Sequence, residues 1–555
     1  MWFELVLTGG LLNFVVLGKP ADGGIDWNPC DGREMRVTAE RPVALSGRWV
    51  SHRCEVRTGP KSLLRDYEFG YNTSFTLHQY YYSDDCTTPS YSLTIRGVLN
   101  EMKKSWMLPG AVDVDYTVTR ITVMPYTQDQ AELLQAAVLK ICPLARFSAQ
   151  SWSPFFSQEI FNYDLYPTTP LAGSAESGVS RIDVEFDCLE ALNFTFDELY
   201  LIRLQRRRWR MPDDPGRHNG TIASRRELYT GETPRVAPAD SGQEIHRPVS
   251  YLADFLIKTD SEITHCPVCR AIEAARSPSQ PPVLRDRKHQ PPFLQSELAG
   301  QWHSVSECES RPSGSFIRRI LTLQPDSAEW QGEYQHYTEP DCQQRSFTIL
   351  GSGTFTLEEP YALIPSAQKI DFLVVNASVT AHLDFVLQQL TAPNNSDCGL
   401  GTWFLNSPKD ITPTNGCRLL GLTIPNADFN IVRLERDTFS NGLLFLGQDY
   451  QESAVPHPHN SPEHFENSAT ISLRPTSFQP ALLQCPPRTQ QRTTLSSSAA
   501  TASSSSGGGS FSSTSKSLLT AHRRNHAERL KTTFSFIMKL SLFVGVPILL
   551  QAVAR

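Results

Sequence analysis

Apolar and polar residues alternate along short stretches of this chain, and turn residues separate the stretches. In the region from 48 to 97 the alternating apolar positions are Tyr67, Phe69, Tyr71, Phe75, Leu77, Tyr91, Leu93 and Ile95. The segments 114–124 and 181–189 repeat the alternation. A period of two residues with aromatic and β-branched side chains at the apolar positions is typical of half-buried β-strands. The pattern therefore predicts a mostly β protein.

Two segments have the period of a helix instead. Residues 127–130, Thr-Gln-Asp-Gln, match a capping box. The apolar positions that follow are Leu134, Ala137, Val138 and Ile141, and their counterparts downstream of Thr380 are Leu383, Val386, Leu387 and Leu390. We therefore expect many antiparallel strands and one packed helix in each of two regions. A closed, lipocalin-like β-barrel fits this content, because closure leaves no long sheet edge exposed.

A series of landmarks occurs twice in the same order. They are Gly-x-Trp at 47–49 and 300–302, Cys-Glu at 54–55 and 308–309, and Arg-Pro-x-Ser with an aromatic residue at 247–251 and 474–478. Recurrence of this kind indicates a tandem duplication. We place the first domain at 45–255 and the second at 297–485, and both sizes are usual for single domains.

The segments outside the two domains have the composition of targeting, linking and anchoring elements. Residues 1–18 contain an apolar run suited to a signal peptide, and 534–554 are long and apolar enough to cross a bilayer as a helix. Ser, Thr and Gly dominate 486–533, which we interpret as a stalk. We expect 19–44 to be an irregular lead-in and 256–296 a proline-rich linker. A C-terminal lipid anchor is the alternative to the transmembrane helix.

Composition and motifs narrow the classes of function. The formal net charge is −7, so we do not expect a nucleic-acid partner. The sequence contains neither H-E-x-x-H nor G-x-S-x-G nor a phosphate-binding loop, and we expect neither an enzyme nor a cofactor or metal. N-glycosylation sequons stand at Asn72, Asn193, Asn219, Asn376 and Asn394. These features predict a glycoprotein of the plasma membrane, single-pass type I with an extracellular ectodomain.

Twelve cysteines, four of them in each repeat, predict disulfides formed in an oxidising compartment. Strands that run up, down and up bring the first two cysteines of each domain to one barrel end. We therefore expect the pairs Cys54–Cys86 and Cys308–Cys342 and, from the cysteines that remain, Cys142–Cys188 and Cys398–Cys417. Four cysteines nevertheless permit three pairings in each domain.

The motif Cys266-Pro267-Val268-Cys269 allows three interpretations. A redox site would need a βαβ context and a zinc site would need a second Cys or His pair, and the sequence predicts neither. We favour structural disulfides in which Cys30, Cys266, Cys269 and Cys485 pair among themselves. In the arrangement that we favour, the two motif cysteines bond to Cys30 and Cys485.

The run Arg206-Arg207-Arg208-Trp209-Arg210 could bind acidic glycans or mark a protease-processing site. We favour a solvated strand end, which is the commoner role of such a run. Aromatic residues such as Tyr80, Tyr81 and Tyr82 are expected in core packing. A barrel of eight strands can also enclose one apolar ligand.

Several motifs occur together between Cys30 and Cys485. They are Gly-x-Trp with Cys-Glu, Tyr-Tyr-x-Asp-x-Cys, Asn415-Gly416-Cys417, the C-x-x-C linker and Arg-Pro-x-Ser-Tyr/Phe. Together they resemble the adenomatosis polyposis coli down-regulated (APCDD) family. One extra residue lies between Trp302 and Cys308 in the second repeat, so the chain is identified as a divergent member. The resemblance implies a membrane-anchored glycoprotein with two tandem domains that antagonises Wnt signalling.

The partners that this resemblance implies are lipidated Wnt proteins, while a Wnt co-receptor and homodimerisation stay open. Each buried methylene of an acyl chain contributes about 0.8 kcal/mol. An apolar barrel interior or a groove between the barrels would bind the fatty acyl chain and withhold it from the receptor, although the sequence does not identify the lining residues. Two alternatives from other classes are an extracellular carrier barrel for free lipids and an adhesion module without a ligand cavity.

Overall fold

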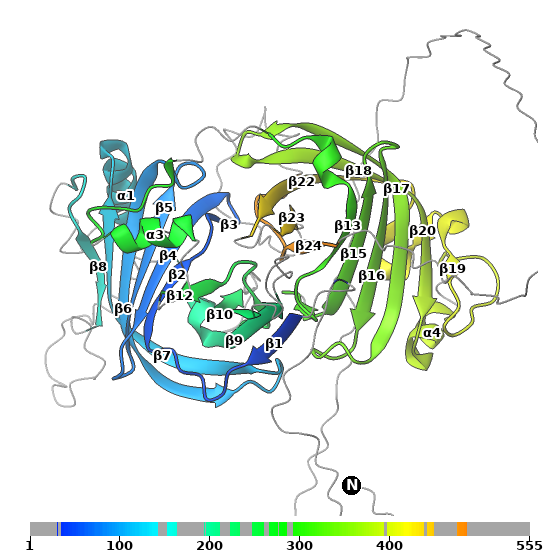
Figure 1. Ribbon diagram of the computed structural model, residues 1–555, viewed down its shortest axis with the longest axis horizontal. Helices are drawn as coiled ribbons and strands as arrows, with labels where there is room; N and C mark the ends of the chain where they lie inside the picture. The colour runs from blue at the N-terminus through cyan, green and yellow to red at the C-terminus, as the bar shows by residue number, and fades with distance from the viewer. Residues whose placement is uncertain are drawn as a thin grey trace, which may run out of the picture.

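Two closed, eight-stranded antiparallel β-barrels with few helices lie side by side in the computed structural model (Figure 1). The predicted fold class, mostly β with two tandem barrels, is thereby confirmed. The described residues are 30, 35–141, 152–163, 192, 194, 196–210, 222–232, 247–259, 266–275, 277–285, 292–312, 314–392, 397–437, 441–448 and 474–485.

Eight strands close the first barrel in the order β2-β4-β5-β6-β7-β9-β10-β12. They are β2 (Gly47–Ser51), β4 (Lys61–Phe69), β5 (Ser74–Tyr82), β6 (Pro89–Lys104), β7 (Ala111–Pro125), β9 (Leu201–Arg210), β10 (Ile222–Glu232) and β12 (Leu256–Lys258). Short strands extend this sheet: β1 (Met35–Ala39) pairs with β9, β3 (Glu55–Arg57) with β4, β8 (Gln158–Asn162) with β7, and β11 (Ser250–Tyr251) with β10.

The second barrel repeats this order with the strands β13-β15-β16-β17-β18-β22-β23-β24. They are β13 (Gly300–Ser304), β15 (Phe316–Gln324), β16 (Glu329–Tyr337), β17 (Arg345–Tyr361), β18 (Ile364–Ala381), β22 (Asn426–Arg436), β23 (Gly442–Leu446) and β24 (Leu482–Cys485). The short strands are β14 (Glu309–Ser310), β19 (Lys409–Asp410), β20 (Gly416–Cys417) and β21 (Leu422–Thr423). The matching strand order shows the duplication directly.

One helix follows β7 in the first barrel, and its counterpart follows β18 in the second. Helix α1 (Gln128–Ile141) begins after Thr127, whose Oγ1 accepts a hydrogen bond from the Gln130 amide at 3.3 Å. The apolar side of α1 joins the first core, and α4 (Asp384–Leu390) joins the second. The predicted helices therefore lie where the periodicity put them. Short 3-10 turns are η3 (Asp197–Tyr200), η5 (Gln295–Leu298), η6 (Thr412–Thr414) and η7 (Arg418–Leu420).

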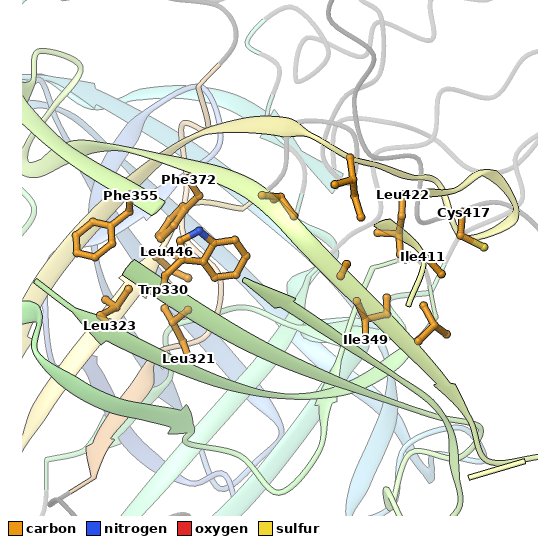
Figure 2. Packing of buried hydrophobic residues seen from close by; sticks show 14 of the residues in the cluster. Leu321, Leu323, Trp330, Ile349, Phe355, Phe372, Ile411, Cys417, Leu422 and Leu446 are labelled. Atoms are coloured by element: carbon orange, nitrogen blue, oxygen red, sulfur yellow. The ribbon is translucent and has the colours of Figure 1, made fainter. Parts of the chain in front are cut away.

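Large apolar side chains fill the interiors of both barrels. Figure 2 shows Trp330, Phe355 and Phe372 packed against leucines from neighbouring strands of the second barrel. The two repeated tryptophans are fully buried and hold the same hydrogen bond. Trp49 donates to the Leu45 carbonyl at 2.7 Å, and Trp302 donates to the Leu298 carbonyl at 2.9 Å. The Gly-x-Trp landmark thus starts each barrel and anchors one end of its core.

The segment expected to be a linker packs on the first barrel. Strand β12 completes that barrel, so the barrel extends to Lys258, beyond the expected boundary at 255. Helix α3 (Pro267–Ala274) then lies on the outer face of β2, β4 and β5 (Figure 1), and Leu284 is buried in the same cluster. Tyr82 OH also donates to the Pro282 carbonyl at 2.5 Å. The prolines therefore belong to a covering layer and not only to a spacer.

The two barrels contact each other reciprocally. The β6–β7 hairpin brings Met107 and Leu108 against the Cys308–Cys342 end of the second barrel. In return, Tyr361 and Ile364 of the β17–β18 hairpin pack against Val56 of the first barrel. Equivalent elements are thus used in both directions, as in an isologous dimer.

The expected terminal segments lie outside the described residues. These are the signal peptide (1–18), the stalk (486–533) and the transmembrane helix (534–554). Among the helices that the structure describes, none has the length and apolar content needed to cross a membrane.

Candidate functional site

A polar cavity of about 140 Å³ lies at the mouth of the first barrel, where the second barrel covers it. Strands β3, β4, β5 and β10, the turn η3 and the segment before β12 form its walls. The second barrel contributes three lining residues, Gln448, Ser477 and Phe478. Barrel mouths and domain junctions are the usual places for ligand sites, so this cavity is the candidate site.

Direct polar contacts join the two barrels around the cavity. Gln448 Nε2 donates to Glu232 Oε1 at 2.9 Å, and the hydroxyls of Thr58 and Ser477 are 3.2 Å apart. Arg53 Nη1 lies 3.2 Å from Glu435 Oε2. Because each bond joins one barrel to the other, the cavity is a property of the tandem and not of either barrel alone.

A fully buried arginine lies beneath the floor of the cavity, which Glu198 and Gln79 line. Arg65 Nε donates to Glu55 Oε1 at 2.9 Å, and its Nη1 donates to Glu198 Oε2 at 3.0 Å. Tyr67 OH donates to Glu198 Oε1, and Gln79 Nε2 donates to the same oxygen at 2.8 Å. The network satisfies two buried carboxylates, which would be costly to bury alone.

The opposite charges in this network favour the charged forms of Arg65 and Glu198. Burial by itself lowers the pKa of Arg65, but the carboxylates of Glu55 and Glu198 raise it above its usual value. Burial by itself raises the pKa of Glu198, but Arg65 and Arg57 lower it below its usual range. Arg65 and Glu198 therefore stay ionised at neutral pH.

The second barrel holds a counterpart of this arginine with different surroundings. Arg319 Nε donates to Glu309 Oε2 at 2.9 Å, and its Nη1 donates to Gln479 Oε1 at 2.7 Å. Burial lowers the pKa of Arg319, and the carboxylate of Glu309 does not fully offset this. A glutamine thus faces Arg319 where Glu198 faces Arg65, so the two barrel mouths differ in charge.

Aromatic rings lead from the cavity into the first barrel. Tyr81 stacks on Tyr91 with ring centroids 4.7 Å apart, and Tyr91 lies 5.9 Å from Phe194. Phe194 and Phe196, 6.4 Å apart, line the cavity and pack on the apolar core. The cavity is smaller than the roughly 300–1,000 Å³ of ordinary ligand pockets. An acyl chain would need more space than the cavity offers in this conformation.

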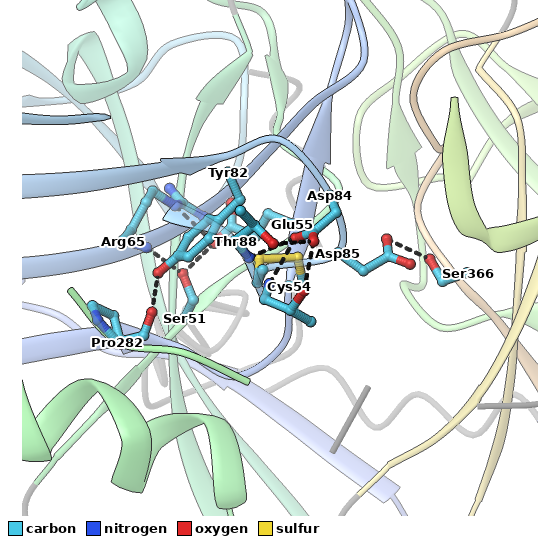
Figure 3. The surroundings of a disulfide bond; sticks show 12 residues. Ser51, Cys54, Glu55, Arg65, Tyr82, Asp84, Asp85, Thr88, Pro282 and Ser366 are labelled. Carbon is cyan, nitrogen blue, oxygen red and sulfur yellow. Dashed lines mark hydrogen bonds and ion pairs between the residues drawn. A yellow bond between two sulfur atoms is a disulfide. The ribbon is translucent and has the colours of Figure 1, made fainter. Parts of the chain in front are cut away.

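The disulfides of the described residues join Cys54 to Cys86, Cys308 to Cys342 and Cys398 to Cys417, the same pairs as expected from the sequence. Figure 3 shows the first of these beside Glu55 and Arg65, with Asp85 bonded across to Ser366 of the second barrel at 3.0 Å. Cys142 and Cys188 lie outside the described residues.

The four remaining cysteines pair among themselves, but the favoured arrangement is wrong. Cys266 bonds to Cys269, and Cys30 bonds to Cys485. The reason is local, because Cys266 caps α3 and accepts a hydrogen bond from the Cys269 amide at 3.1 Å. One helical turn then brings the two Cα atoms to 5.3 Å, within the range that a disulfide needs.

Two of the predicted sequons lie at exposed positions. Asn72 stands in the exposed β4–β5 turn, and Asn376 is exposed on β18. Asn193, Asn219 and Asn394 lie outside the described residues. The glycosylation itself stays a prediction.

The arginine run occupies β9, and alternation divides it between two faces. Arg207 is buried between the barrels, where its Nε donates to Glu227 Oε1 at 2.9 Å. Burial by itself raises the pKa of Glu227, but Arg207 and Arg225 lower it to about 2. Arg206 and Arg208 lie on the opposite face. The interpretation as a solvated strand end is therefore wrong for Arg207.

Sequence reasoning missed the floor of the cavity, although a signal was present. Glu55 and Arg65 are ten residues apart, and so are Glu309 and Arg319. A charged pair at one spacing in both repeats, on strands with an apolar inward phase, marks a buried ion pair. Glu198 gave no such signal, because it belongs to a 3-10 turn without a periodic pattern.

Comparison with known families matches the family model described as "Adenomatosis polyposis coli down-regulated 1". The match covers residues 32–285 and again residues 288–505, so each barrel has its own match. Together the two stretches include most of the chain. This protein therefore belongs to the adenomatosis polyposis coli down-regulated (APCDD) family.

Proposed function

We propose that the protein is a negative regulator of Wnt signalling that binds lipidated Wnt proteins at the cell surface. The observation that carries the proposal is the family match over both barrels. The disulfides support it, because they form and persist in oxidising compartments outside the cytosol. In this proposal residues 534–554 attach the chain to the plasma membrane as a single-pass type I protein.

The acyl chain of Wnt enters the first barrel at the cavity. Phe194 and Phe196 are only partly buried, and they approach the core from a segment outside the barrel strands. When they move, the chain takes their place beside Tyr81 and Tyr91. Each methylene buried there contributes about 0.8 kcal/mol, so even part of a long chain supports micromolar binding.

The polar rim of the cavity suits the protein part of the ligand. Arg57, Lys61, Glu232 and Asp254 line the cavity around the aromatic residues. An acylated side chain ends in a polar ester next to a polypeptide, so the aromatic side of the cavity suits the acyl chain and its charged residues suit the ester and the polypeptide. A purely apolar pocket would fit a free lipid equally well.

A substitution that fills the cavity tests this mechanism. Ala253 lines the cavity and is partly exposed, so Ala253→Trp places an indole in the cavity with little risk to folding. The matched control is Ala427→Trp, at an exposed position on β22 of the second barrel. Cells that display the full chain are incubated with acylated Wnt and with a Wnt variant that lacks the acylation site.

We expect acylated Wnt to bind at least tenfold more tightly than the non-acylated variant, a difference of about 1.4 kcal/mol. Ala253→Trp should remove that difference and relieve inhibition in a Wnt reporter assay, whereas Ala427→Trp should not. Equal binding of both Wnt forms would refute acyl capture but leave the antagonism standing. Full inhibition without any Wnt binding, or no inhibition at all, would refute the proposed function.

A further inference from the structure

We propose that an N-linked glycan on Asn376 covers an apolar patch on the outer face of the second barrel. The patch consists of Leu350, Leu373, Val375 and Phe429. The inference rests on the position of Asn376 beside this patch, on a β-bulge that turns Asn376 outward, and on a comparison with the first barrel. It does not depend on Wnt binding, because the patch lies on the outside of the strands and not at the cavity.

The four side chains of the patch are exposed although they belong to regular strands. Leu350 is 37% exposed, Leu373 42%, Val375 40% and Phe429 43%. Leu373 lies opposite Ala427, two residues before Phe429 on the neighbouring strand. Residues that are diagonal in this way lie about 7–8 Å apart, within reach of an aromatic side chain. Exposed apolar side chains that gather on one face mark a contact surface.

A β-bulge brings the glycosylation acceptor to this patch. The register of β18 against β17 skips Val375, which lies between the paired residues Val374 and Asn376. A bulge of this kind interrupts the alternation of the two faces of a strand. Val375 and Asn376 are consequently both exposed, whereas the residues that precede and follow them are buried. An oligosaccharide on Asn376 thus begins next to Val375, and Leu373 lies about 6.8 Å further along the same face.

The first barrel has the same bulge but neither the patch nor a sequon there. Its β6–β7 pairing skips Thr119, just as the β17–β18 pairing skips Val375. The positions at the two bulges correspond in order: Thr117, Thr119 and Arg120 in the first barrel, and Leu373, Val375 and Asn376 in the second. These positions are therefore polar in the repeat without an acceptor and apolar in the repeat that has one.

An N-glycan has the chemistry that this patch requires. Sugar rings have C–H faces, which pack on aliphatic and aromatic side chains, and hydroxyl groups, which remain in water. The attachment to Asn376 holds the sugars at a high effective concentration beside the patch, so weak contacts are sufficient. A face that is covered in this way is closed to other proteins. A protein partner of the ectodomain would then bind on another face.

Hydroxyl-radical footprinting of the solubilised full chain, read by mass spectrometry, tests the cover directly. Leu373 is compared with Leu363, which is 44% exposed at the tip of the β17–β18 hairpin and is a matched control. Oxidation is measured on the glycosylated chain and again after enzymatic release of the glycans from the folded protein, so no variant has to fold. The mass of the peptide that contains Asn376 shows whether a glycan is attached.

We expect Leu373 in the glycosylated chain to be oxidised at less than half the rate of Leu363. After release of the glycans the two rates should be equal, and the rate of Leu363 should not change. Equal rates before release would overturn the proposal, and so would an Asn376 without a glycan. Slow oxidation of Leu373 that persists after release would also overturn it, in favour of a second copy of the chain on this face.

Substitutions test what the cover does. Asn376→Gln and Ser378→Ala remove the same sequon at different residues, and Asn72→Gln removes a sequon of the first barrel as the control. Chemical crosslinking of the full chain on cells measures self-association. The first two variants should associate at least about tenfold more strongly than the native chain, and Asn72→Gln should not. Adding Leu373→Thr/Val375→Thr to Asn376→Gln, which copies the first barrel, should abolish the increase. An increase that persists in this combination, or an equal increase in Asn72→Gln, would overturn the proposal.

Discussion

Replacing the buried arginine of each barrel by methionine should destabilise the two barrels unequally. Arg65 contacts two carboxylates, those of Glu55 and Glu198, whereas Arg319 contacts the carboxylate of Glu309 and the amide of Gln479. Methionine keeps much of the side-chain volume but removes the charge. Arg65→Met thus leaves two buried carboxylates with Arg57 as their remaining cation, at 3.2 Å from Glu55 and 3.5 Å from Glu198. Arg319→Met leaves one, Glu309, with Arg311 at 3.8 Å.

The size of the difference follows from these contacts. Removing one partner of a buried ion pair costs about 3–5 kcal/mol, mostly because the remaining charge stays buried. We expect Arg319→Met near the lower end of that range. Arg65→Met should cost at least about 1 kcal/mol more, since a buried group without a partner costs about 1–3 kcal/mol. Glu198→Gln added to Arg65→Met should recover part of the loss, because the two side chains are directly coupled.

Hydrogen exchange with mass spectrometry resolves the two barrels, which need not unfold in one step. Peptides from β4–β5 report on the first barrel, and peptides from β15–β16 report on the second. The expected result is a larger loss of protection in β4–β5 for Arg65→Met than in β15–β16 for Arg319→Met. A larger cost for Arg319→Met, or no recovery by Glu198→Gln, would refute the assignment of Glu198 as a second buried anion.

Three further predictions concern pH and modification. The pKa of Glu227 is about 2 because Arg207 outweighs its burial, so about 3 kcal/mol of stability is present above pH 4.5 and is lost as the pH falls towards 2. Glu227→Gln should make the free energy of unfolding in urea nearly independent of pH over that window. An unchanged pH dependence in this variant would contradict the assignment to Glu227. Burial lowers the pKa of His336 to about 4. Acidification from pH 7 to 5 should therefore lower the free energy of unfolding by about 2 kcal/mol, because the histidine takes up a proton in the unfolded chain but not in the folded one. His336→Phe should abolish this loss in thermal unfolding. Asn72→Gln and Asn376→Gln should each remove one glycan mass from the intact protein, and an unchanged mass would show an unused sequon.

Much of the fold could be predicted because its signals are local. Period-two alternation indicated the strands around 67–97 and 114–124, whereas the alternating segment 181–189 lies outside the described residues. The capping box at 127–130 located the start of α1. The Arg-Pro landmark at 247–248 and 474–475 makes the same contact with a glycine in each barrel. A Cβ on Gly231 would lie 2.6 Å from Pro248, and one on Gly447 would lie 2.6 Å from Pro475. Close packing of this proline on a glycine therefore has the same structural role in both repeats.

The missed elements depend on partners distant in sequence. Strand β12 has three residues, too few to show a period, and it is a strand only because β2 and β10 lie on its two sides. Strand β1 lies in the expected irregular lead-in, and its partner β9 begins more than 150 residues later. The cavity was hidden for the same reason, since Gln448 and Ser477 reach it from the other barrel. Local pattern thus predicts the long elements, whereas the short strands and the cavity depend on neighbours in space.

The reciprocal contacts of the barrels bring equivalent positions together beside the cavity. Glu232 and Gln448 follow the equivalent glycines Gly231 and Gly447, and they hydrogen-bond to each other. An interface in which a position meets its own counterpart is that of an isologous dimer, here joined into one chain. Fusion allows the two halves to diverge, because each position then mutates alone. At this junction the arginine of the first barrel faces two carboxylates, those of Glu55 and Glu198, whereas its counterpart faces the carboxylate of Glu309 and the amide of Gln479. The tandem can therefore present one specialised mouth, which a symmetric pair of identical barrels could not.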